Sequence, residues 1–231
     1  MRQLPFATYA LALLISIAFL ADSCSKKHEA EPPPVINPTV NPLPYTVMAY
    51  LLTPKDQQFN ADYYRAIKST TIRLQGWFKD QLGKTFMVNP VVIDTLSGLH
   101  ETTWYSSDEG PAISGTNPPF ETTKYEMKQL LGQSFDTVHH TYFVFVPSDF
   151  GDATTPRGIA IEGRGVLIGI SGSSPDGSTG DAAHALSHAF GLPEPSVETA
   201  NGVMSAGYTK FPNCVFTQDE KDSLLATPFF Q

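Results

Sequence analysis

The stretch of sequence that decides the fold is Asp181 to Tyr208, which reads DAAHALSHAFGLPEPSVETANGVMSAGY. His184 and His188 are four residues apart, so on a helix both imidazoles lie on one face and can hold one metal ion. Gly191 can end that helix with a positive φ and reverse the chain, which brings Glu194 back toward the same point. Three protein ligands with one open coordination position form the layout of a catalytic zinc site. The spacing therefore predicts a metal centre.

The same residues also allow an interpretation without a metal. Two histidines on one helix face can pack against aromatic rings or bond to backbone carbonyl groups. Glu194 stands between Pro193 and Pro195, in a loop that could simply be solvated. The geometry of the three side chains decides between the two interpretations, because only a metal site requires their ligand atoms to converge on one point.

At these residues the chain resembles the metzincin clan of zinc metallopeptidases, whose motif H-E-x-x-H-x-x-G-x-x-H is followed by a methionine-containing turn. His184 to Glu194 (HALSHAFGLPE) follows that spacing, and Met204 stands where the methionine turn would lie. The resemblance covers about residues 45–231 and is strongest with the lipoprotein metallopeptidase-like branch of bacteria. It implies an α+β, zincin-like fold with a mixed twisted sheet and long helices, and a Zn²⁺ ion bound by His184, His188 and Glu194.

Two positions depart from the family motif. Ala185 occupies the place of the glutamate that takes a proton from the zinc-bound water and delivers it to the leaving amine. An alanine methyl can do neither, and general acid–base catalysis is typically worth about 10²–10⁴ in rate. Glu194 replaces the third histidine, which is a mild change because a carboxylate is an acceptable zinc ligand. The resemblance therefore implies a metallopeptidase-like protein that is inactive or severely impaired.

Three functions remain open on these grounds. The first is a zinc-bound domain that holds a peptide or protein in its cleft without hydrolysing it. Residues 165–170 (GVLIGI), expected to form a strand, could pair with such a peptide by strand addition. The second is an active zinc endopeptidase with a substitute base, but Ser187 is a poor base without a partner histidine and Glu162 is expected to be a surface charge. The third is a structural or partner-binding lipoprotein in which the cleft has no role.

The N-terminus carries export signals. Residues 6–20 form an apolar run shorter than the roughly 20 residues that a spanning helix needs, which favours a signal peptide. Cys24 follows Leu-Ala-Asp-Ser in a pattern similar to a bacterial lipobox, which implies cleavage before Cys24 and a lipid on its thiol. Ordinary secretion, with Cys24 incidental, is the alternative. We expect a signal peptide at 1–23, the lipidated Cys24 with a proline-rich tether at 24–44, and the zincin-like domain at 45–231, held at the cell envelope on its periplasmic or outer side.

Composition excludes several classes of protein. The chain has 231 residues and a formal net charge of -8 with no basic cluster, so it is a poor candidate for nucleic-acid binding. Its two cysteines are too few for a disulfide scaffold or a zinc ribbon. Cys214 is expected to be a small buried apolar residue. His139 and His140 are adjacent in a presumed strand, point to opposite faces and are expected to be structural.

Hydrophobic periodicity predicts strands alternating with helices. A long helix is expected from Asn60, its N-cap, to Leu82, with Gly83 as its stop. Thr217 and Glu220 match a capping box that opens a last short helix. The expected strands are 45–52, 86–96, 138–146 and 166–170, and the other expected helices are 122–131 and 181–190.

Overall fold

The computed structural model describes residues 43–107, 118–150, 157–172 and 175–230. These belong to one compact unit, Pro33–Gln231. The signal peptide, Cys24, nearly all of the tether and most of the loop expected between residues 106 and 119 lie outside the described residues, so lipid attachment and the domain boundaries stay predictions. Within the described part of the chain, no helix combines the length and apolar character needed to cross a membrane.

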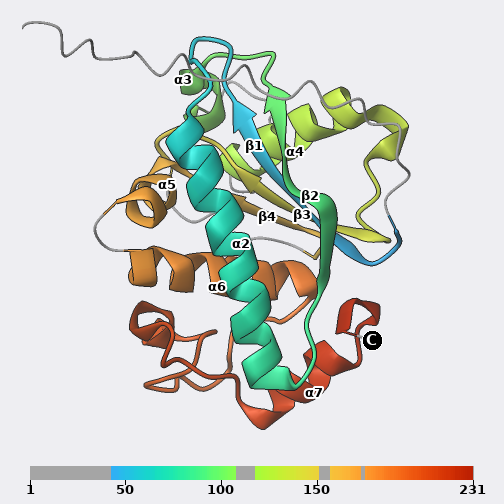
Figure 1. Cartoon of the computed structure of the whole chain (residues 1–231), viewed down its shortest axis with the longest axis vertical. Coiled ribbons are helices and arrows are strands. Elements are labelled where there is room, and N and C mark those ends of the chain that lie inside the picture. The colour runs from blue at the N-terminus through green and yellow to red at the C-terminus, as the bar shows by residue number, and fades with distance from the viewer. Residues whose placement is uncertain (1–42, 108–117, 151–156, 173–174, 231) are drawn as a thin grey trace, which may run out of the picture. The chain divides into compact units, whose positions relative to one another are not determined.

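A four-stranded sheet with the order β2-β1-β3-β4 organises the described residues (Figure 1). The strands are β1 (Thr46–Thr53), β2 (Met87–Ser97), β3 (His140–Phe145) and β4 (Ile159–Glu162). A mixed sheet was expected, but neighbouring strands within the described residues pair only in parallel. β2 lies at one edge and its pairing with β1 is interrupted around Pro90, which agrees with the edge position that a proline favours.

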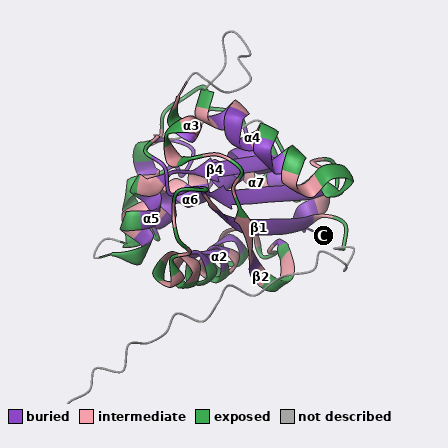
Figure 2. Ribbon diagram, turned by 90° about the horizontal axis from the view of Figure 1, so that it is seen from above, coloured by how far each residue is buried: buried purple, intermediate pink, exposed green. Residues whose placement is uncertain are grey.

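Helices cover both faces of the sheet. α2 (Ala61–Leu82), α5 (Arg164–Ser171) and α6 (Pro175–Phe190) share one apolar core with the sheet, and α3 (Thr102–Ser106) and α4 (Pro118–Leu131) contribute to a second core. Figure 2 shows α2 and α4 on opposite sides of the buried strands. Side chains alternate between the cores along each strand, so that Phe143 and Phe145 face α2 while Tyr142 and Val144 face α4.

Local signals set the ends of two helices as predicted. The side-chain oxygen of Asn60 accepts hydrogen bonds from the backbone N–H groups of Asp62 and Tyr63 at the start of α2. Gly83 follows the end of α2 with a φ of 72°, in the left-handed region that favours glycine. α7 (Gln218–Leu225) opens with the complete capping box of Thr217 and Glu220. Three short 3-10 helices complete the described chain: η2 (Gly132–Ser134), η3 (Ala206–Lys210) and η4 (Pro228–Phe230).

The strand predicted at 166–170 is wrong. These residues form α5, in which Val166, Leu167 and Ile170 are buried while Ile168 is exposed, a helical spacing. The short strand β4 supplies the fourth strand instead. The prediction that Glu162 is a surface charge is also wrong, because Glu162 ends β4 and is only 1% exposed. Peptide pairing with residues 165–170 by strand addition is excluded, since a helix has no free strand edge to offer.

Cys214 is buried, as expected, and burial raises the pKa of its thiol to about 11. Only the thiolate reacts with alkylating agents. In protein produced from residue 25 onward, we expect iodoacetamide at pH 8 to modify Cys214 on the order of a hundredfold more slowly than an ordinary free thiol. Mass spectrometry over time, with the protein in guanidinium as the fast reference, measures this. Equal rates in the two samples would contradict a buried thiol.

Candidate metal centre

Helix α6 and the turn that follows it bring the three predicted ligands together. His184 and His188 lie one turn apart on α6, which ends at Phe190. Gly191 has a φ of 110°, and the backbone N–H groups of Gly191 and Leu192 donate to the carbonyl oxygens of His188 and Ser187. This reversal returns the chain along the last turn of the helix, and Glu194 reaches the two imidazoles from the returning segment.

The ligand atoms of these three side chains converge. Nε2 of His188 lies 3.1 Å from Nε2 of His184 and 3.2 Å from Oε1 of Glu194. All three ligand atoms lie within 4.8 Å of one another. His188 is buried, whereas the Glu194 side chain is 62% exposed, so the cluster is open to solvent on the carboxylate side. An open side leaves room for a further ligand.

The other ring nitrogen of each histidine is fixed by a backbone carbonyl. Nδ1 of His184 lies 3.0 Å from the carbonyl oxygen of Val203, and Nδ1 of His188 lies 2.8 Å from that of Leu192. A carbonyl only accepts hydrogen bonds, so the neutral rings carry their protons on Nδ1 and present unprotonated Nε2 atoms. Two such lone pairs facing each other at 3.1 Å repel unless a cation or a shared proton lies between them.

The residues fit a divalent metal ion. Ligand atoms about 2.0–2.2 Å from a tetrahedral zinc ion stand about 3.3–3.6 Å from each other. Nε2 of His188 lies close to this spacing from both other ligand atoms, at 3.1 and 3.2 Å, and the whole set spans no more than 4.8 Å. The Nδ1–carbonyl bonds are the outer contacts that orient metal-binding histidines. The interpretation without a metal, in which the histidines bond only to backbone carbonyls, explains the positions of the Nδ1 atoms. It does not explain why both Nε2 atoms and a carboxylate face one point. The metal interpretation accounts for all three.

Neither Ser187 nor Glu162 is placed to act as a base in place of the glutamate that the motif would have at Ala185. Ala185 lies on α6 directly after His184 and is 9% exposed. The hydroxyl group of Ser187 is buried and donates to the carbonyl oxygen of Ala183, so it is committed to the helix backbone. Glu162 belongs to β4 and is buried at the end of the sheet. Ala185 itself cannot transfer a proton.

The segment that follows α6 packs against this helix and contacts the cluster. Met204 is buried in the same core as α6, and the preceding Val203 supplies the carbonyl that fixes His184. Tyr208, which was not among the predicted site residues, lies on η3 with its ring centroid 5.3 Å from that of His184. The only sequence feature that pointed to Tyr208 as a site residue was its position at the end of the Asp181–Tyr208 stretch. The Tyr208 ring therefore lies beside the imidazole of His184.

Close packing at Gly180 holds η3 against α6. A Cβ atom at Gly180 would overlap the backbone carbonyl oxygen of Tyr208, whereas one at Gly177, on the same helix, would meet nothing within 4 Å. We expect Gly180→Ala to lower the free energy of unfolding by about 1–3 kcal/mol. Gly177→Ala should raise it by up to about 1 kcal/mol, because alanine favours the helix. Urea denaturation of both variants measures the contrast, and equal stabilities would refute the close contact.

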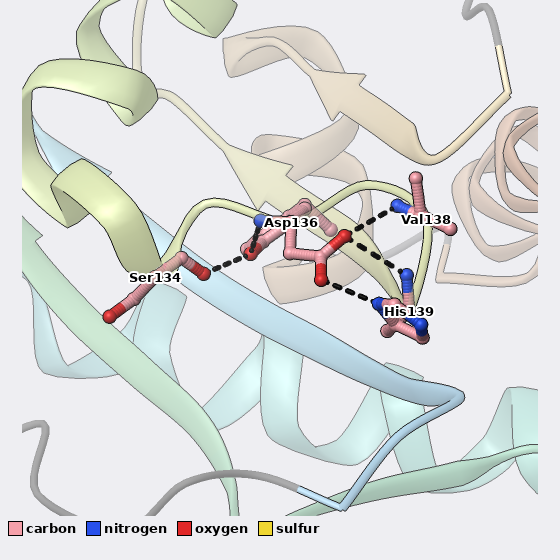
Figure 3. Close-up of polar contacts among 5 residues, drawn as sticks. Ser134, Asp136, Val138 and His139 are labelled. Atoms are coloured by element: carbon pink, nitrogen blue, oxygen red, sulfur yellow. Dashed lines mark hydrogen bonds and ion pairs between the residues drawn. The ribbon is translucent and has the colours of Figure 1, made fainter.

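His139 and His140 do not belong to the cluster. His139 precedes β3, and its Nδ1 lies 2.6 Å from Oδ2 of Asp136 (Figure 3). The other carboxylate oxygen, Oδ1, accepts from the backbone N–H groups of Val138 and His139. The bond from His139 holds the pKa of the Asp136 carboxyl below its usual range. His140 begins β3 and is buried, and burial lowers its pKa. The contacts of both residues are structural.

No family model matches this chain, and no curated protein matches it. Among solved structures, it is similar to a catalytically inactive OgpA from Akkermansia muciniphila, determined in complex with an O-glycopeptide (glycodrosocin) substrate. The TM-score is 0.60 at 13% identity, and the match covers 82% of this chain and 62% of OgpA. Metalloproteinase-II from Bacteroides fragilis also matches, with a TM-score of 0.44 at 16% identity, over 81% of this chain and 54% of that one.

The likeness to OgpA concerns the fold. This chain spans less than two thirds of the length of OgpA, and at 13% identity the match carries no residue roles. The chain shares an α+β fold with OgpA, which is the fold class that the sequence predicted. Within that fold, His184, His188 and Glu194 form a candidate metal site.

Proposed function

We propose that this chain is a zinc-binding, metallopeptidase-like protein that binds a peptide or protein segment and hydrolyses it feebly or not at all. The observation that carries the proposal is the convergence of two Nε2 atoms and one carboxylate around a single point, beside an alanine at the general-base position. Zinc is the metal that this donor set suits best, because imidazole nitrogen and carboxylate oxygen at tetrahedral spacing are its usual ligands.

The roles of the chain's own residues follow from their contacts. His184 and His188 would hold the ion through Nε2, in orientations set by the Val203 and Leu192 carbonyls. Glu194 would neutralise part of its charge and leave the solvent side open. Bound zinc polarises a carbonyl group and lowers the pKa of a water molecule. With Ala185 in place of a carboxylate, no side chain at that position accepts the proton, so binding persists where efficient hydrolysis does not.

A peptide is the proposed ligand because the structurally similar OgpA was determined with an O-glycopeptide substrate. The open cluster gives a peptide carbonyl access to the metal, and the Tyr208 ring lies beside His184. A partner protein could present the same carbonyl group from an extended loop. Peptide and protein ligands therefore share one mode of binding at this site.

Zinc content and proteolysis together test the proposal. Protein produced from residue 25 onward is loaded with Zn²⁺, dialysed, analysed for metal and incubated with denatured casein. We expect one zinc ion per chain and cleavage no faster than in the EDTA-treated sample. Absence of stoichiometric zinc would remove the metal centre. Robust EDTA-sensitive cleavage would replace the proposal with an active endopeptidase that uses another base.

We further propose that Cys24 carries a lipid that holds the domain at the bacterial envelope. The support is the apolar run at 6–20 followed by Cys24 and a proline-rich tether. In a bacterial host fed an alkyne fatty acid, the full-length chain should become labelled and partition into the membrane fraction. Cys24→Ser should be unlabelled. Labelling of the Cys24→Ser variant would place the lipid elsewhere, and an unlabelled, secreted wild type would indicate ordinary export.

A further inference from the structure

A pocket separate from the metal cluster lies at the carboxyl ends of the sheet strands. None of the residues that line it belongs to that cluster. Its volume is about 240 Å³. The end of β1, the loop into α2 and the start of α5 form its walls. The polar and aromatic side chains that line it are Thr53, Gln57, Gln58, Asn60, Tyr63 and Arg164.

The strand order places this pocket where parallel sheets bind ligands. In the order β2-β1-β3-β4, the chain leaves β1 toward β2 on one side and leaves β3 toward β4 on the other. The loops after β1 and β3 therefore diverge and open a crevice between them. In open parallel sheets, ligands bind in the crevice outside the carboxyl ends of the strands at such a switch point. The pocket occupies this crevice, since Thr53 ends β1 and Pro147 follows β3.

Hydrogen bonds fix the polar groups of the pocket in advance. The Gln57 amide nitrogen donates to the Pro147 carbonyl at 2.9 Å and to the Thr102 hydroxyl at 2.7 Å, which orients its amide group. An Nη atom of Arg164 donates to the same Pro147 carbonyl at 2.9 Å. Groups held in place before binding lose less conformational entropy when a ligand arrives.

The pocket lining carries one positively charged side chain. Arg164 is the one charged side chain among its lining residues, and no carboxylate lines it. Asp149 lies 3.3 Å from Nε of Arg164, but its side chain is 77% exposed, so solvent screens that pair. A guanidinium group pairs with carboxylates through planar, charge-assisted hydrogen bonds. The fixed positive group therefore favours a carboxylate on the ligand.

We propose that this pocket binds a sugar acid. The Arg164 guanidinium receives the carboxylate. Gln57 offers its amide oxygen and Asn60 its amide nitrogen to the ring hydroxyls, because their other amide atoms are already hydrogen-bonded. Gln58 and the Thr53 hydroxyl offer both donors and acceptors. The Tyr63 ring gives an apolar surface for the carbon face of the sugar. The volume is below the roughly 300–1,000 Å³ of drug-sized ligand sites, which suits a ligand of about one ring.

The probes are D-glucuronate and N-acetylneuraminate, with D-glucose as the uncharged counterpart of glucuronate. Binding to protein produced from residue 25 onward is measured by calorimetry and ligand-observed NMR in EDTA, so that a carboxylate cannot report on the metal centre. At least one acid should bind with a dissociation constant in the millimolar range or below. D-glucose should bind at least about tenfold more weakly, because a hydrogen bond to a charged group is stronger than one to a neutral group by about the free energy that corresponds to a tenfold change in affinity. Failure of both acids, or equal binding of D-glucose, would overturn the proposal.

Variants separate the pocket from the fold. Arg164→Gln should weaken binding of the acid about tenfold or more, while Asp149→Asn should leave it unchanged or strengthen it, because a competing carboxylate is removed. Gln58→Ala, at an exposed loop position, should weaken binding of the acid without unfolding the chain, and it serves if Arg164→Gln proves unstable. If a folded Arg164→Gln variant binds the acid with unchanged affinity, this pocket is not the binding site. If only Gln58→Ala folds, unchanged affinity in that variant leads to the same conclusion.

Discussion

Replacing His188 by alanine should abolish stoichiometric zinc binding. His188 is the centre of the cluster, since its Nε2 is the atom within 3.2 Å of both other ligand atoms. Without it, one imidazole and one exposed carboxylate remain, and two ligands do not form a closed protein site for zinc. Metal analysis after dialysis should fall from one zinc ion per chain to background. The loss should be larger than for Glu194→Ala, because the carboxylate sits on the open side and water can take its place.

Zinc-dependent stability gives a second measurement of the same change. A ligand that binds only the native state at 100 times its dissociation constant raises the free energy of unfolding by about 2.7 kcal/mol. Thermal unfolding of the wild type should therefore shift upward with Zn²⁺, and that of His188→Ala should not. His139→Ala is the matched control, because it removes an exposed imidazole that contacts Asp136 far from the cluster in sequence. Zinc-dependent stabilisation that survives in His188→Ala would place the metal elsewhere.

Sequence alone predicted the elements whose signals are local. Asn60 and Gly83 bound α2 because an N-cap acceptor and a left-handed C-terminal residue act within one helical turn. The capping box at Thr217 predicts α7 for the same reason. The spacing of four from His184 to His188 fixes their common helix face, and the positive φ of Gly191 reverses the chain as its residue type suggested. Each of these features depends on a few consecutive residues.

Features that depend on tertiary packing were not predictable. The run Val166–Ile170 is rich in β-branched residues and favours a strand, yet packing against α2 and α6 makes it a helix. β4 has only four residues, too few for alternation to show in the sequence. Glu162 looks like a surface charge until the sheet is assembled around it. The contact of Tyr208 with His184 depends on the close approach of η3 to Gly180, which no sequence pattern marks.

Ala185→Glu should convert the zinc-bound protein into a measurable peptidase. A carboxylate next to His184 on α6 restores the group that takes the proton from zinc-bound water, and general acid–base catalysis is worth about 10²–10⁴ in rate. Alanine and glutamate are both strong helix formers, so the helix itself should tolerate the change. Cleavage of denatured casein by the zinc-loaded variant, compared with its EDTA-treated form, measures the gain.

Ala185→Gln is the matched control, because glutamine has nearly the same size and shape as glutamate but cannot act as a base. If the gain comes from proton transfer, only the glutamate variant cleaves, and adding His188→Ala to it removes the activity. A gain in the glutamine variant would instead indicate a change in packing at the 9% exposed position of Ala185. A folded, zinc-loaded Ala185→Glu variant without activity would mean that the cleft lacks more than its base. The chain would then be a binding protein whose metal centre holds ligands rather than an enzyme that has lost one residue.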